Sequence, residues 1–103
     1  MSLVVQLQNQ NNACVVRVCG EVDVSNAPEL RSSLEDGLSE MPSDMTVDLS
    51  DVSYIDSTGI GVLVGAAHKA SEAGIPFAVE NPQRNVARVP SLLGVDGQLG
   101  IRA

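Results

Sequence analysis

The strongest constraint on the fold of this chain is the alternation of short β-branched segments with segments of helical periodicity. Residues 3–8 and 13–21 are rich in apolar residues and are separated by an amide-rich turn, so together they predict a β-hairpin. Between residues 27 and 41 apolar side chains recur every three or four positions, which predicts a helix that packs on a sheet. Asn26 precedes this segment and Glu29 follows three residues later, so we expect Asn26 to cap the helix.

The rest of the chain repeats the same alternation. Further strands are expected at residues 45–49, 76–80 and 98–101, with a helix that opens at 56–59 and stops at Gly74 and a third over 82–93. We expect Pro90 to kink or shorten the third helix, and Asp96-Gly97 to form a turn. The order β-β-α-β-α-β-α-β predicts an α/β fold, in which residues 1–103 form a single domain with helices packed on one mixed sheet.

Composition narrows the classes of function. The formal net charge is −7, which argues against binding to nucleic acid or to an anionic membrane and favours a basic partner surface. The first ten residues lack the pattern of a signal peptide, and the apolar run 59–67 is too short to span a membrane, so a cytoplasmic location is expected. Cys14 and Cys19 are five positions apart and would lie on opposite faces of a strand, which predicts two reduced cysteines rather than a disulfide.

The most informative segment follows the strand at 46–49. An irregular loop there ends in Asp56-Ser57-Thr58-Gly59, which opens a helix and places Ser57 at or near its N-cap. The positive end of the helix macrodipole tolerates negative charge, so a phosphate on Ser57 is acceptable to the local structure. Gly59 and Gly61 either let another backbone approach or leave the first turn bare of side chains. From the residues alone, Ser57 is either a phosphorylation site or a plain helix cap.

Two motifs give the chain a family resemblance. Asp56-Ser57-Thr58-Gly59-Ile60-Gly61, after Thr46-Val47-Asp48-Leu49, resembles the signature of the STAS-domain family, and the closest likeness is to the bacterial anti-sigma factor antagonists. Gly20-Glu21-Val22-Asp23 resembles a second landmark of that family. The likeness spans nearly the whole chain, and the two motifs occur in the expected order.

The resemblance implies a mechanism of partner switching. The unphosphorylated protein would bind an anti-sigma factor that is also a serine protein kinase, and so release a sigma factor. The kinase would then phosphorylate Ser57, with Thr58 as second choice, and a phosphoserine phosphatase would reverse the reaction. The residues implied in partner binding are Asp23, Asp56, Ser57, Thr58, Gly59, Ile60 and Gly61. A second reading of the same family is a constitutive STAS subunit of a stressosome-like or transporter assembly.

Enzyme functions fit the sequence poorly, so we expect neither catalysis nor a cofactor. The glycines at 59, 61 and 65 do not have dinucleotide-binding spacing. The single histidine, His68, lies eleven residues after Ser57 in the same predicted helix, about 16 Å away, and cannot serve as its base. Asp48, Asp51 and Asp56 could hold a divalent ion, but we expect a solvated acidic rim and no metal.

Overall fold

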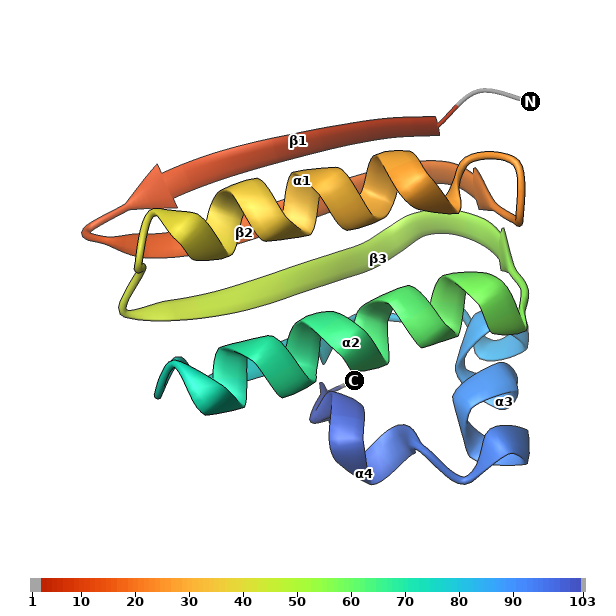
Figure 1. Cartoon of the computed structure of the whole chain (residues 1–103). Coiled ribbons are helices and arrows are strands. Elements are labelled where there is room, and N and C mark those ends of the chain that lie inside the picture. Colours follow the sequence, from red (N-terminus) through yellow and green to blue (C-terminus); the bar gives the residue numbers. More distant parts are fainter. Residues whose placement is uncertain (1–2, 103) are drawn as a thin grey trace.

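The computed structural model describes residues 3–102 and shows a two-layer α/β arrangement (Figure 1). The strands are β1 (Leu3–Gln10), β2 (Ala13–Val22), β3 (Asp44–Ile55), β4 (Phe77–Glu80) and β5 (Ile101–Arg102). The helices are α1 (Ala27–Ser39), α2 (Ser57–Glu72), α3 (Arg84–Leu93) and α4 (Asp96–Leu99). The predicted mixed sheet with packed helices is confirmed.

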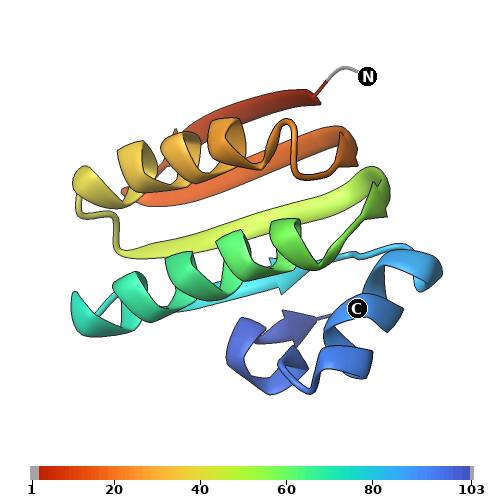
Figure 2. The same cartoon turned by 45° about the vertical axis from the view of Figure 1, so that its right-hand side comes forward.

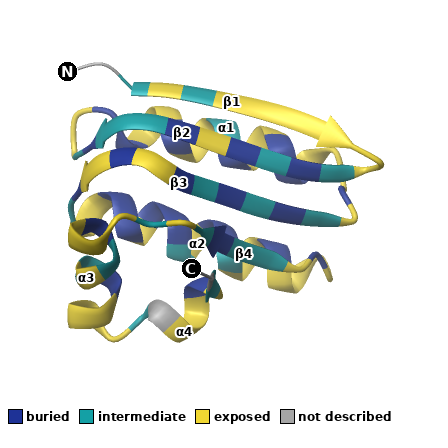
Figure 3. Cartoon of the chain, turned by 180° about the vertical axis from the view of Figure 1, so that it is seen from behind, coloured by how far each residue is buried: buried dark blue, intermediate teal, exposed yellow. Residues whose placement is uncertain are grey.

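All five strands form one sheet in the order β1-β2-β3-β4-β5. The hairpin of β1 and β2 is antiparallel, whereas the other three neighbouring pairs are parallel. Helices α1 and α2 lie side by side on one face of the sheet (Figures 1 and 2). The view from behind shows no helix over the opposite face of β1, β2 and β3 (Figure 3).

The core lies between the sheet and helices α1 and α2, and it is aliphatic as expected. In β2, Cys14, Val16 and Val18 are buried while the residues between them are more exposed, which is the period of two of a strand covered on one face. Helix α1 buries Leu30 and Leu34 completely. Buried apolar side chains of this kind contribute about 1.5–3 kcal/mol each, so this layer holds the domain together.

Strand β3 is longer than the sequence predicted. It runs from Asp44 to Ile55 through a polar stretch that we expected to be a loop. Two register shifts against β2, between Arg17 and Cys19 and between Gly20 and Glu21, place extra residues in β3. The bulges accommodate the polar residues without ending the strand, and Gly20 adopts a φ of 114° there, which a side chain would disfavour.

The C-terminal segment also differs from the prediction. Pro90 lies inside α3 without ending it, and the helix stops at Gly94 in the left-handed conformation with a φ of 72°. The turn expected at residues 96–97 is the one-turn helix α4, which is followed by a second left-handed glycine, Gly100. Burial of Leu99 in the core explains the extra turn, because a helical turn directs this side chain inward.

Candidate functional site

The candidate site lies where β2 and β3 end, at the start of α2. The register pairs Val22 with Ile55, and the backbone N–H of Asp56 donates to the carbonyl of Val22 at 3.2 Å. Parallel strands deliver their carboxyl ends to the same edge of a sheet, so the loop after β2 lies beside the first turn of α2 (Figure 2). The two sequence motifs, about 35 residues apart in the chain, therefore meet at this edge.

Asp56, not Ser57, caps α2. A carboxylate oxygen of Asp56 accepts a hydrogen bond from the backbone N–H of Gly59 at 3.0 Å. Ser57 is the first residue of the helix, next to the cap, which agrees with the predicted place of Ser57 at or near the N-cap. Its side chain is exposed, and its hydroxyl makes no hydrogen bond within residues 3–102. The hydroxyl of Ser57 therefore does not perform the helix capping that would have given it a structural role.

The next residues divide between the interior and the surface. Thr58 and Gly61 are exposed, whereas Gly59 and Ile60 are buried. A Cβ on Gly59 would lie 2.6 Å from a methyl of Val22, so this glycine allows α2 to pack tightly against the sheet. Gly59 and Ile60 are among the residues implied in partner binding, and the structure places both in the interior, below the exposed first turn.

The loop after β2 has its own hydrogen-bond network. A carboxylate oxygen of Asp23 accepts from both the backbone N–H and the hydroxyl of Ser25, at 2.9 and 2.5 Å. The hydroxyl bond, more than any other effect, lowers the pKa of Asp23 below its ordinary value. Asp23 is therefore ionised at neutral pH and held in one orientation.

Asn26 stabilises this loop rather than capping α1 through its side chain. Its amide oxygen accepts from the backbone N–H of Asp23 at 2.9 Å, and its amide nitrogen donates to the carbonyl of Glu21 at 2.8 Å. The capping bond predicted from the spacing of Asn26 and Glu29 is absent among the described residues. Asn26 is buried because its amide satisfies the backbone groups of the loop.

Sequence reasoning missed Val24 as a candidate contact residue. Its side chain is 70% exposed at the tip of the loop, between Asp23 and Ser25. A single valine in a polar segment gives no signal in the sequence, and only its exposure in the loop after β2 singles it out. We give the name Ser57 surface to the half-buried Asp23 together with the exposed residues Val24, Ser57, Thr58 and Gly61.

The other carboxylates considered as metal ligands lie on the sheet. Asp51 accepts a weak hydrogen bond from the thiol of Cys19 at 3.8 Å, and Asp48 lies 3.8 Å from Arg17. Burial alone would raise the pKa of Asp48, but hydrogen bonds from Ser50 and other groups outweigh it and lower the pKa. Among the described residues, no three His, Cys, Asp or Glu side chains cluster as metal ligands would.

Three smaller observations concern His68, the two cysteines and the length of the helices. His68 lies on α2, exposed, with its ring nitrogen 3.7 Å from Glu72. Cys14 and Cys19 are both free, and burial raises the pKa of the Cys14 thiol, which keeps it protonated. In the part of the chain that the structure describes, no helix is long and apolar enough to cross a membrane.

Known proteins resemble this chain over its whole length. The STAS domain family matches residues 4–103. An anti-sigma-B factor antagonist of Bacillus subtilis (strain 168) is 35% identical over 103 residues, which cover 100% of this chain and 94% of that protein.

Solved structures agree with the fold. The crystal structure of an anti-sigma factor antagonist from Mycobacterium paratuberculosis superimposes with a TM-score of 0.89 at 25% identity, covering 97% of this chain and 85% of that one. The anti-sigma factor antagonist SpoIIAA in its unphosphorylated form matches with a TM-score of 0.81 at 19% identity, over 97% of this chain and 89% of that one. At that identity SpoIIAA shows the shared fold alone. With the family match and the Bacillus subtilis relative, these findings establish that the chain belongs to the STAS domain family.

Proposed function

We propose that this protein is an anti-sigma factor antagonist whose binding to an anti-sigma factor is switched off by phosphorylation of Ser57. The observation that carries the proposal is the state of the Ser57 hydroxyl. It is exposed at the first residue of α2 and unbonded among the described residues, while Asp56 performs the capping. A kinase can therefore modify Ser57 without breaking a bond that the fold needs.

The charges around Ser57 explain how a phosphate would act. A phosphate adds about −1.5 to −2 charges at neutral pH. The helix start tolerates this charge locally, and Asp56 and the ionised Asp23 make the same edge acidic already. A partner surface that closes over this edge would have to desolvate the added dianion beside like charges. A loss of about 3–4 kcal/mol, which is a hundredfold to thousandfold in affinity, needs no change of fold.

The implied partners follow from the same reading. The anti-sigma factor would be a serine protein kinase that phosphorylates Ser57, and a phosphoserine phosphatase would restore binding. The anti-sigma-B factor antagonist of Bacillus subtilis and the phosphorylated structure of SpoIIAA, which has the same fold, support this reading. The protein would act as a cytoplasmic regulator rather than as an enzyme. Thr58 is the alternative acceptor, since its side chain is also exposed.

The decisive experiment measures the affinity for the host's own anti-sigma factor kinase by calorimetry. We expect Ser57→Ala to bind as the unmodified protein does but to resist phosphorylation, and Ser57→Asp to bind at least tenfold more weakly. The matched control is Ser71→Asp, which adds the same charge at an exposed position of α2 about 21 Å away and should leave binding unchanged.

Two results would contradict the proposal. If Ser57→Asp binds as tightly as Ser71→Asp, the electrostatic switch is wrong. If unmodified protein shows no binding to the kinase and mass spectrometry finds no phosphate on Ser57 or Thr58 in stressed or resting cells, a constitutive STAS subunit becomes the better interpretation.

A further inference from the structure

A groove of about 150 Å³ lies between α1 and α2, outside the core and beside the Ser57 surface. Its floor is made of buried apolar side chains, Leu34 of α1 with Val62 and Ala66 of α2. Gly61 and Gly65 form its α2 wall, where they expose the backbone of the helix. The volume is below the ~300 Å³ at which small-molecule sites begin, so the groove suits a side chain or backbone of another protein.

The two wall glycines have no role inside the molecule. A Cβ on Gly61 or Gly65 would meet no atom within 4 Å, and neither residue has a positive φ. By contrast, a Cβ on Gly59 or Gly37 would collide with a side chain at 2.6 or 2.7 Å. Glycine in a helix interior is unfavourable, so α2 contains two residues that lower its helix stability and leave open space beside the helix.

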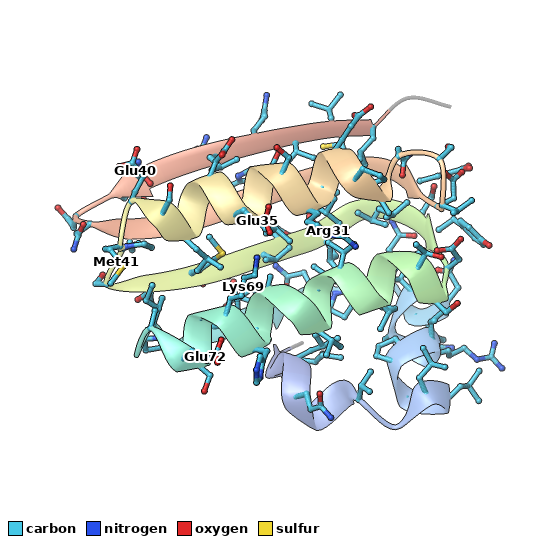
Figure 4. The ribbon with its side chains drawn as sticks, in the orientation of Figure 1. Arg31, Glu35, Glu40, Met41, Lys69 and Glu72 are labelled. Carbon is cyan, nitrogen blue, oxygen red and sulfur yellow. The ribbon has the colours of Figure 1, made fainter. Side chains whose placement is uncertain are left out.

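The charges at the rim of the groove indicate the chemistry of that molecule. Arg31 and Glu35 of α1 and Lys69 of α2 lie in the space between the two helices (Figure 4). Lys69 pairs with Glu35, whereas Arg31 makes no hydrogen bond or salt bridge within residues 3–102. Two cations against one carboxylate leave this rim positive on a chain of net charge −7. The rim therefore complements a carboxylate.

We propose that this groove receives an α-helix of the anti-sigma factor, with small or apolar side chains against Gly61 and Gly65 and an acidic side chain against Arg31. The inference rests on the proposed function and extends it. Gly61 lies one turn, about 6 Å, along α2 from Ser57, and Gly65 one turn further, so the contact would continue the Ser57 surface down the helix. Glycines at this spacing let a second helix approach the backbone of α2 closely.

The test compares stability with affinity in the same variants. Gly65→Ala and Gly65→Leu introduce better helix formers into open space, so both should raise the melting temperature by roughly 4 °C or more. The affinity of the unphosphorylated protein for the anti-sigma factor kinase should fall severalfold for Gly65→Ala and at least tenfold for Gly65→Leu. Gly97→Ala is the matched control, because Gly97 is a helical glycine of α4 whose Cβ would also meet no atom within 4 Å; its binding should not change.

A second pair of variants tests the charge. Arg31→Gln should weaken binding severalfold, while Arg17→Gln, which removes the same charge on the opposite face of the sheet, should not. If the Gly65 variants are more stable and still bind like wild type, the groove is not a contact surface and only this inference fails. If wild type itself does not bind the kinase, the proposed function fails and this inference falls with it.

Discussion

The inner and the outer face of α2 both contain glycines, but these glycines serve different purposes. On the inner face, Gly59 and Leu63 pack against the sheet, and the packing leaves no room for an additional atom at Gly59. On the outer face, Gly61 and Gly65 are exposed, and an added Cβ at either position would meet no atom within 4 Å. The comparison teaches that a glycine is needed for packing only where the neighbouring atoms leave no room for a methyl group.

The largest effect on stability should come from the inner face. Leu63→Ala removes a completely buried side chain between α2 and the sheet, and we expect a loss of about 2–5 kcal/mol in the free energy of unfolding. Chemical denaturation followed by circular dichroism measures it. Ser71→Ala, an exposed change on the same helix, should alter stability by less than about 0.5 kcal/mol. Equal effects of the two changes would mean that α2 does not pack as described.

The sharpest test of the comparison uses two glycines two residues apart. Gly59→Ala forces a methyl against Val22 and Ile55, and we expect a loss of about 1–3 kcal/mol from overpacking. Gly61→Ala meets nothing and should instead add about 0.5–1 kcal/mol through helix propensity. Thermal unfolding of both variants decides the sign. If Gly61→Ala destabilises the protein, the outer face of α2 has an internal role that the structure does not show.

Removing the N-cap of α2 should have an intermediate effect on the stability of the protein. Asp56→Ala removes the acceptor of the Gly59 N–H and should cost about 1 kcal/mol of stability. Asp56→Asn keeps an oxygen at the same place and should lose little. Hydrogen exchange at the amides of the first turn would show whether the loss is local to the helix start. Equal stability of Asp56→Ala and Asp56→Asn would exclude a capping role.

The smallest effect should be electrostatic and dependent on pH. The hydrogen bond from Lys69 lowers the pKa of Glu35, so this pair stabilises the fold above the ordinary pKa of glutamate. The contribution disappears as the pH falls through the lowered pKa and Glu35 becomes protonated. Lys69→Gln should raise the pKa of Glu35 toward its ordinary value in an NMR titration. His68→Gln, at the neighbouring exposed position, is the control and should leave that pKa unchanged.

Much of the fold could be predicted because its elements have local signatures. The period of two in β2 and the apolar repeat of α1 place both elements within a few residues of their observed bounds. The extended β3 could not be predicted, since Ser50, Asp51 and Ser53 read as a loop and only the bulged pairing with β2 keeps them in a strand. The one-turn helix α4 depends in the same way on burial of Leu99 by segments distant in sequence.

In the candidate site, too, some features could be predicted from local sequence and others depend on the tertiary structure. Ser57 and Asp23 could be singled out from their motifs, because residue type and spacing are properties of the chain itself. The capping role of Asp56 could not be predicted, because Asp56 and Ser57 both have side chains that can cap a helix and only the backbone geometry selects Asp56. The loop role of Asn26 could not be predicted either, because its side chain is equally suited to cap α1. The exposure of Val24 and the open space at Gly65 have no signal in the sequence, whereas Gly61 could be singled out from its motif.

By itself, then, the sequence determined the alternation of strands and helices, the aliphatic core and the serine at the start of α2, since periodicity and residue chemistry act over a few positions. The tertiary structure alone decided the strand order, the meeting of the two motifs at one sheet edge, and which glycines are packed and which face outward. These depend on contacts between segments far apart in the chain, and hydrophobic burial, which drives such contacts, does not specify a partner until the fold provides it.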